Sequence, residues 1–215
     1  FSGCSSLTDV VLSSNITNIS DYTFQNCTGL TEVPLTNNIT SIGYYAFAGC
    51  TGIVSLVIPE GVKSIDNSAF VNCTNLRTLS IPSTMESIYS HRNSNTGLQY
   101  HSFQGCPIDS IYWNAKAYST TNGEGPFEYH TQKTTIRSIV FGDSVQSLPS
   151  EMCIGMSGLK SVKFEGSVKT INSYAFQDCS SLEKIVIPES VTSIGTYAFS
   201  GCSSLTDVVL SSNIT

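Results

Sequence analysis

The sequence predicts a solenoid of short stacked coils, with a parallel β-sheet of about nine short strands, much irregular chain and little helix. Three observations predict it. A Phe-x-x-Cys element recurs along the chain, mostly every 23 residues. Residues 1–17 return unchanged as residues 199–215, 198 positions later. Most cysteines occupy one repeat position rather than pairs. A fixed period of about 20 to 50 residues is typical of solenoids, so we treat residues 1–215 as one array.

The coil from Phe47 to Ala69 shows the pattern of the repeat. Apolar residues alternate from Ile53 to Ile58, which predicts a short strand, and Pro59 ends it because proline has no N–H for a ladder. A second extended stretch follows at residues 62–65, and the chain then turns toward the next Phe. One coil cannot cover its own apolar side, so neighbouring coils must bury it.

The strand units repeat the pattern Leu-x-x-Leu-x-Leu with apolar variants. At about 4.8 Å between neighbouring strands, the eight steps from Phe1 to Phe199 span about 40 Å. The nine units are residues 7–12, 30–35, 53–58, 76–81, 108–113, 136–141, 159–164, 182–187 and 205–210.

The cysteines predict a structural column rather than a disulfide framework. Seven of the eight lie three residues after a repeat Phe, where a small buried thiol packs as a hydrophobe. No Cys-x-x-Cys pair is present, so the sequence predicts no metal site. The column consists of Cys4, Cys27, Cys50, Cys73, Cys106, Cys179 and Cys202. In the coil at Cys153, Cys replaces the repeat Phe and Met156 replaces the repeat Cys.

The segments Ile58–Cys73 and Ile187–Cys202 read Ile-Pro-Glu-x-Val-x-Ser-Ile-x-x-x-Ala-Phe-x-x-Cys. In these segments the chain resembles the BspA-type leucine-rich repeat surface proteins, a class with 23-residue repeats. The resemblance covers nearly the whole chain and implies a leucine-rich-repeat solenoid. It also implies an extracellular, surface-exposed protein, of a family in which several members are implicated in adhesion to host or matrix proteins.

Two polar insertions interrupt the repeat, at about residues 89–102 and 114–133, and both are expected to be loops. This irregular middle holds all three histidines, the only Trp and half of the tyrosines. Loops on a rigid scaffold often carry binding residues. One interpretation is therefore a contact surface; in the other, Trp113 simply fills an inward strand column and His130 is tolerated at a Cys-like position. The candidate contact residues are Tyr89, His91, Tyr100, His101, Tyr112, Tyr118 and Tyr129.

The outward side of the strand units carries an apolar stripe, of which five of nine members are Val. Such a stripe indicates either an interaction surface or only the preference of Val for pleated strands. The stripe consists of Val11, Pro34, Val57, Ser80, Tyr112, Val140, Lys163, Val186 and Val209.

Composition excludes several classes of function. The formal net charge of −6 disfavours nucleic-acid binding, and no apolar run is long enough to span a membrane. The cysteines are interchangeable repeat positions, and no phosphate-binding glycine loop or carboxylate pair occurs. We therefore expect no catalytic residue, no cofactor and no enzyme activity.

Six Asn-x-Ser/Thr sequons are candidate N-glycosylation sites, although about four are expected by chance in so Ser/Thr-rich a sequence. They are Asn15, Asn18, Asn26, Asn38, Asn72 and Asn213.

The two leading hypotheses differ in what the protein binds. In the first, the chain is an extracellular structural or adhesive protein, part of a longer tandem array or a head-to-tail filament, because both ends carry the same uncapped apolar coil. Its partners are then copies of itself or host or matrix proteins. In the second, the chain is a receptor-like module that binds a ligand through the Tyr- and His-rich loops.

Overall fold

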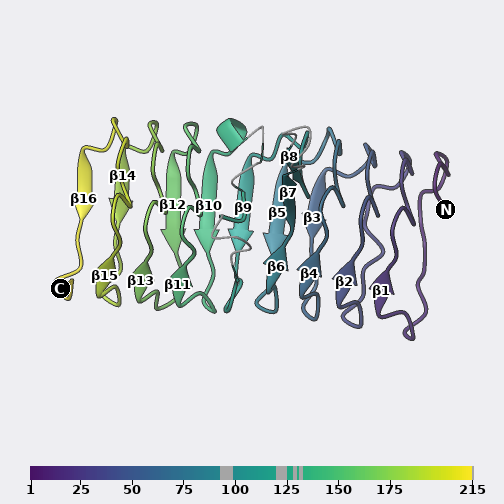
Figure 1. The fold of residues 1–215 in the computed structure, drawn as a ribbon, viewed down its shortest axis with the longest axis horizontal. Helices are drawn as coiled ribbons and strands as arrows, with labels where there is room; N and C mark the ends of the chain where they lie inside the picture. The colour runs from purple at the N-terminus through teal and green to yellow at the C-terminus, as the bar shows by residue number, and fades with distance from the viewer. Residues whose placement is uncertain (93–98, 120–124, 128–129, 131–132, 215) are drawn as a thin grey trace.

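The computed structural model describes residues 1–92, 99–119, 125–127, 130 and 133–214. Its coils follow one another along one nearly straight axis from the N-terminal to the C-terminal end (Figure 1). Each regular coil contributes short strands to two parallel rows, and the described residues contain almost no helix. The predicted solenoid with parallel strands is confirmed.

The first strand row contains the Leu-x-x-Leu-x-Leu units. Inward residues alternate with outward ones, as in Ser55–Val57, where only Leu56 is buried. All its pairs are parallel and in register, so that equivalent residues lie side by side. The row consists of β3 (Ser55–Val57), β5 (Thr78–Ile81), β9 (Ser110–Trp113), β10 (Ser138–Phe141), β12 (Ser161–Phe164), β14 (Lys184–Val186) and β16 (Asp207–Val209).

The second strand row consists of two-residue strands, each ending in an Ile or Leu that points into the coil. It forms where the sequence predicts the second extended stretch. Its members are β1 (Asn18–Ile19), β2 (Ser41–Ile42), β4 (Ser64–Ile65), β6 (Ser87–Ile88), β11 (Ser147–Leu148), β13 (Thr170–Ile171) and β15 (Ser193–Ile194).

A third column of hydrogen bonds joins the coils at the corner before each Cys. The N–H of Phe24 donates to Ala46 O at 2.8 Å, and the N–H of Phe47 donates to Ala69 O at 2.7 Å. The corner needs left-handed residues. Gly49, at φ 71°, is one of them, and a Cβ there would lie 2.3 Å from Asn26 Oδ1. Coils are thus held together on three sides.

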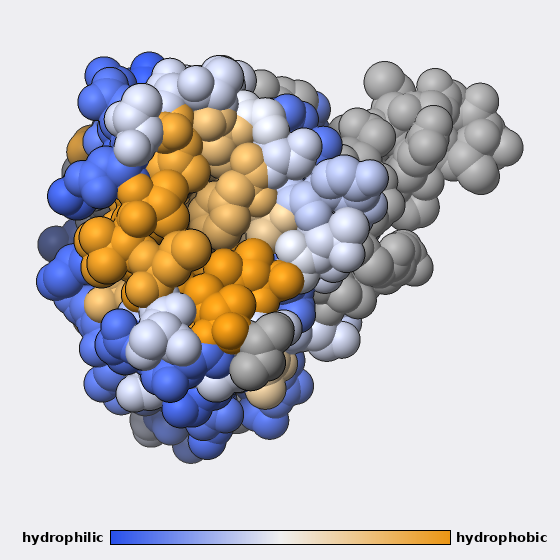
Figure 2. Space-filling model, turned by 90° about the vertical axis from the view of Figure 1, so that its left-hand side faces the viewer, coloured by the Kyte–Doolittle hydropathy of each residue, from blue (hydrophilic) through white to orange (hydrophobic). Residues whose placement is uncertain are grey.

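The core runs through the centre of the coils. Figure 2, which looks onto the end formed by the C-terminal coil, shows apolar side chains in the middle and polar ones around the rim. Phe24 stacks between Phe1 and Phe47, with ring centroids 5.4 and 5.2 Å away. Each Phe of this stack lies over its repeat equivalent, so a coil covers its apolar side only against its neighbours.

The first row differs from the prediction in one respect: seven of the nine predicted units form strands. Residues 7–12 and 30–35 have no strand, and the row divides into a five-stranded sheet and the pair β14–β16. Pro34 accounts for the first gap, because it stands at the repeat position of Ser80 and Val209 but has no N–H. The N–H of Leu35 turns back to Val33 O at 2.8 Å.

The first insertion also differs from a plain loop. Its two ends pair as an antiparallel hairpin of β7 (Ser90–Arg92) and β8 (Gln99–His101). Pairing satisfies backbone groups that would otherwise be left unbonded where the insertion leaves the coil. In the second insertion, the described part includes the 3-10 helix η2 (Lys133–Thr135).

Candidate interaction surface

The outward side of the first strand row is the most regular exposed surface among the described residues. Val11, Val57 and Val186 are 92, 67 and 51% exposed, whereas Val140 and Tyr112 are half-buried. The predicted stripe therefore lies on the surface. Fixed spacing makes this side of the molecule a ladder of side chains at about 4.8 Å steps.

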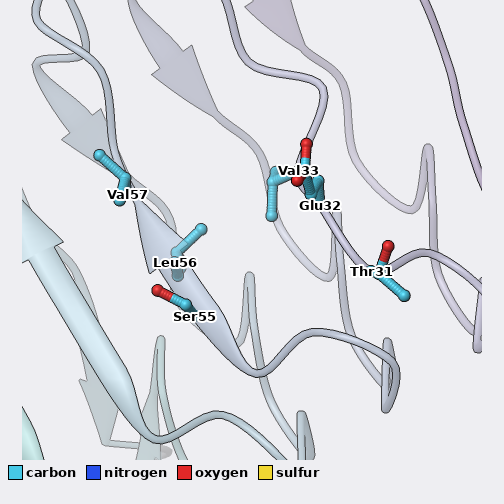
Figure 3. A pocket seen from close by; sticks show the side chains of 6 residues that line it. All are labelled: Thr31, Glu32, Val33, Ser55, Leu56 and Val57. Carbon is cyan, nitrogen blue, oxygen red and sulfur yellow. The ribbon is translucent and has the colours of Figure 1, made fainter.

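Shallow hollows lie where the first row is interrupted. One of about 370 Å³ lies between the unpaired segment 31–33 and β3 (Figure 3). It is lined by Thr31, Glu32, Val33, Ser55, Leu56 and Val57. Another, of about 290 Å³, lies between β12 and β14, which are not hydrogen-bonded to each other. The hollows are thus a consequence of the broken ladder.

Charge is unevenly distributed along this surface. Residues 1–62 contain four carboxylates and no Lys or Arg, because Lys63 is the first basic residue of the chain. Asp9 and Glu32 are exposed on the first two coils, and both line one hollow. Toward the other end, Lys160, Lys163 and Lys184 are exposed on neighbouring strands. One end of the surface is therefore acidic, and the other carries a cluster of lysines.

The structure distributes the candidate loop residues between surface and core. Tyr89 is exposed, and Tyr112 is half-buried on the outward side of β9, within electrostatic reach of the carboxylates of Glu165 and Asp143. Burial and these carboxylates raise the pKa of Tyr112. Tyr118 packs against Trp113, and its hydroxyl donates to Ile88 O at 3.3 Å. The side chains of His91 and Tyr100, and Tyr129 as a whole, lie outside the described residues.

His101 joins the two insertions inside the molecule. It is buried, its Nδ1 accepts the N–H of Phe103 at 3.1 Å, and its Nε2 donates to Pro126 O. Its ring lies 5.8 Å from the buried ring of His130, near the ammonium group of Lys133. Burial lowers the pKa of His101 to about 4 and that of His130 to about 3. Both histidines are therefore neutral at pH 7.

Trp113 and His130 take the inward positions that the second interpretation assigned to them. Trp113 is fully buried at the end of β9, paired in register with Phe141. The N–H of His130 donates to Phe127 O at 3.0 Å, as the N–H of Cys27 donates to Phe24 O. His130 therefore stands where other coils have Cys. Neither of its ring nitrogens has a hydrogen-bond partner among the described residues.

The cysteines stack as thiols between neighbouring coils. The Sγ atoms of Cys50, Cys73 and Cys106 donate to the carbonyls of Phe24, Phe47 and Phe70 at 3.0–3.2 Å. All eight cysteines are free, and burial raises the pKa of Cys50 to about 12. A buried protonated thiol is a poor nucleophile and a poor metal ligand. In the described part of the chain, no group of three His, Cys, Asp or Glu could hold a metal ion.

The six sequons all lie at exposed asparagines. Some of their amides are engaged within the solenoid: Asn38 Nδ2 donates to Ser14 O at 3.1 Å, and Asn213 Nδ2 donates to Glu189 O at 2.8 Å. Asn26 and Asn72 adopt left-handed backbone conformations, with φ 57° and 61°. Asn15 and Asn18 both lie on the exposed part of the first coil.

The structure adds exposed and half-buried tyrosines that the sequence analysis did not single out. Tyr22, Tyr44 and Tyr45 form a cluster with ring centroids 4.4–5.6 Å apart, and Tyr174 stacks on Tyr197 at 5.5 Å. Four of the five have a left-handed backbone, with φ between 55° and 60°. The signal of these four in the sequence is a Tyr two residues before the repeat Phe.

Comparisons with known proteins agree with this architecture. The family model of the BspA type leucine rich repeat region matches in six copies, over residues 1–122 and 127–215. No curated protein matches the sequence. In the described residues, no helix has the length and apolar character needed to cross a membrane.

Three solved structures are similar to this chain. A leucine-rich repeat protein from Bacteroides ovatus is 24% identical, with a TM-score of 0.44, over 100% of this chain and 70% of that one. A T. pallidum leucine rich repeat protein is 22% identical, with a TM-score of 0.48, over 92 and 77%. A leucine rich cell surface protein from Faecalibacterium prausnitzii is 19% identical, with a TM-score of 0.29, over 90 and 83%.

Proposed function

We propose a function on the premise that the chain belongs to the BspA-type leucine-rich repeat family. In this proposal it is a non-enzymatic structural or adhesive protein outside the cell, at a cell surface. Its solenoid is part of a longer tandem array whose unit is 198 residues. The array presents one repeated surface to protein partners.

One observation supports this proposal most directly. The repeated seventeen-residue segment is covered by a neighbouring coil on one face at the start of the chain and on the opposite face at its end. In residues 1–17 the following coil covers it: Phe1 stacks on Phe24 at 5.4 Å, and the N–H of Gly3 donates to Gln25 O at 2.7 Å. In residues 199–215 the preceding coil covers it: Phe199 stacks on Phe176 at 5.2 Å, and Ser200 O accepts the N–H of Asp178 at 2.8 Å.

Because the two sequences are identical, one copy of this coil can take both neighbours at once. The solenoid can then pass from one 198-residue unit into the next without a change in its packing. The phenylalanine stack and the corner hydrogen bonds would continue across the junction. A continuous rod suits a structural or adhesive role, since it displays one surface many times.

The test is a chain in which residues 1–198 precede the 215-residue sequence. We expect one rod, longer than the present chain by about 40 Å, in small-angle scattering. The control carries a flexible Gly/Ser spacer at the junction, which should hinge there. If the direct fusion scatters like the spacer control, the array proposal is wrong.

A second candidate function is a receptor-like module that uses the insertions. The observation that favours it is the contact of His101 with Pro126 O, which joins the two insertions and gives their loops a rigid base. Replacing Tyr89 and Tyr112 by Ala tests it, because Tyr89 is exposed and Tyr112 is half-buried, so the loss of either side chain disturbs the core little. A receptor should lose its ligand, whereas an array protein should keep its partners.

A further inference from the structure

The pattern of charge along the first strand row points to a specific partner for this surface. Each coil presents outward residues at three places: two just before or at the start of the strand, and one near its end. From the N-terminal end, the first, second, fifth and ninth coils carry an acidic set of outward residues. The fourth, sixth and seventh carry a basic set, with two lysines in the seventh, and the third and eighth have no net charge. The charged members are Asp9, Glu32, Arg77, Asp109, Arg137, Lys160, Lys163, the pair Glu183 and Lys184, and Asp207.

We propose that two copies of this chain pair face to face through the first strand row, with their solenoid axes in opposite directions. A two-fold axis runs parallel to the strands, between β5 and β9. We number the coils by their strand units, from coil one (residues 7–12) to coil nine (residues 205–210). Coils one to eight of one copy then oppose coils eight to one of the other. A two-fold axis makes this interface isologous, so every contact occurs twice and the assembly closes as a dimer.

This register matches opposite charges. Asp9 lies opposite Lys184 of the second copy, and Glu32 lies opposite Ser161, one residue from Lys160. Near the axis, Arg77 lies opposite Asp109. All are exposed in the single chain. Lys184 already contacts Asp207 in its own chain at 2.6 Å, so in the dimer it would lie between two carboxylates.

The apolar stripe is matched in the same register. Val11, 92% exposed, lies opposite Val186, and Val57, 67% exposed, lies opposite Val140. Because the two-fold axis is parallel to the strands, residues near the strand ends meet residues near the strand ends. Pairing thus covers the two most exposed valines of the described residues, Val11 and Val57, with valines of the second copy.

The neighbouring registers are less favourable. Moving the axis onto β9 places Asp109 against its own copy and Asp9 against Asp207. Moving it onto β5 still places Asp9 and Glu32 opposite basic coils, but it sets Arg77 against its own copy and leaves Asp109 opposite the uncharged third coil. Like charges brought together in an interface oppose association, so the charge pattern selects the axis between the two strands.

The available area is adequate for a stable dimer. A strip of eight coils at about 4.8 Å, and six residues wide at about 3.3 Å per residue, covers about 760 Å² on each copy. Specific interfaces bury about 800 Å² per partner. The proposal goes beyond the tandem array and does not depend on it, because it concerns the side of the solenoid and not the junction between units.

The test uses two charge-reversed variants of the 215-residue chain, analysed by sedimentation and native mass spectrometry at low salt. One carries Asp9→Lys and Glu32→Lys, and the other carries Lys160→Glu and Lys184→Glu. The unmodified chain should dimerise. Each variant alone should bind itself about a hundredfold more weakly, because like charges now face each other.

An equimolar mixture of the two variants should recover a 1:1 heterodimer, because each reversed end now opposes its complement. The control variant, Lys63→Glu with Lys169→Glu, makes the same charge change beside the second strand row and should dimerise normally. The proposal is overturned if the unmodified chain stays monomeric at high micromolar concentration. It is equally overturned if either variant alone remains dimeric, or if the mixture does not pair.

Discussion

Residues 7–12 and residues 205–210 have the same sequence, Leu-Thr-Asp-Val-Val-Leu, yet only the second copy forms a strand. The second copy includes β16, which pairs with β14 in register. The first copy lies beside residues 30–35, where Pro34 removes a donor and Leu35 bonds back to Val33. The same six residues are therefore a strand only when the neighbouring coil provides a ladder.

The difference teaches that strand formation in a solenoid belongs to pairs of coils rather than to single coils. The first coil is nevertheless held at its corner, where Cys27 Sγ donates to Phe1 O at 3.2 Å and Phe1 stacks on Phe24. The last coil has the corner contacts and the ladder. The two copies should thus differ in local stability, although their side chains are identical.

The largest expected effect comes from removing the phenylalanine ring that stacks on each copy of the repeated segment: Phe24 on the first copy and Phe176 on the last. Phe24→Ala and Phe176→Ala should each lower the free energy of unfolding by about 3–5 kcal/mol, because both rings are fully buried. Hydrogen exchange should separate the two variants. Residues 1–12 should exchange freely in Phe24→Ala, whereas Val209 should keep some protection in Phe176→Ala, since β16 retains its ladder. Equal loss of protection in both would contradict the comparison.

Low pH should destabilise the middle of the molecule, where His101 and His130 lie. It should not change the difference in local stability between residues 7–12 and residues 205–210. The folded-state pKa values of His101 and His130, about 4 and about 3, lie below the ordinary value of 6.5. Their contribution to stability is therefore complete above pH 6.5 and is lost as the pH falls from 6.5 toward 4. Over the full shifts, linkage gives about 3 kcal/mol for His101 and about 5 kcal/mol for His130.

Fluorescence of Trp113, the only Trp, reports on this region because it lies beside Tyr118 and Phe127. Denaturant midpoints should fall between pH 6.5 and 4 and change little with pH in His101→Phe/His130→Phe. An acid response that is unchanged in the double variant would show that other groups cause it.

Restoring the backbone N–H that Pro34 lacks should remove the difference between residues 7–12 and residues 205–210. Pro34→Val should allow residues 7–12 and 30–35 to enter the sheet and should stabilise the chain by about 1 kcal/mol, the net value of a hydrogen bond or two. Amide exchange of Val10 and Val11 should slow. The matched control is Pro59→Ala, which changes a proline just after β3 and should leave residues 7–12 as they are.

The smallest effect separates the two equivalent aspartates. Asp207 contacts Lys184, whereas Asp9 shares a hollow with the like-charged Glu32. Asp207→Asn should destabilise the monomer by no more than about 0.5 kcal/mol, because the ion pair is exposed. Asp9→Asn should be neutral or slightly stabilising. Denaturation at low and high salt would measure both, and the difference should disappear in high salt.

Much of the fold could be predicted from the repeat. The 23-residue period places Leu56, Leu79 and Ile185 in one inward column because stacked coils must align equivalent residues. Pro34 was visible as a member of the outward stripe. Its effect on two neighbouring ladders became clear only when the pairing was known, since a missing N–H matters through its partner.

The sequence shows where the two insertions lie, but it does not predict their structure. Composition marks residues 89–102 and 114–133 as insertions, yet the repeat says nothing about how they contact each other. The burial of His101 depends on the Pro126 carbonyl from the other insertion, a contact between segments without a common period. The exposed Tyr22 cluster was within reach of sequence reasoning, because it follows the regular spacing.

The corner stack of phenylalanines has an evolutionary consequence. Since Phe24, Phe47 and Phe70 meet their neighbours in almost the same way, deletion or duplication of one complete coil by unequal recombination would rejoin surfaces that already fit. Such an event changes the length of the molecule in quanta of about 4.8 Å and creates no new kind of contact. Gain or loss of whole coils can therefore change the length of the solenoid in evolution with little cost to its folding.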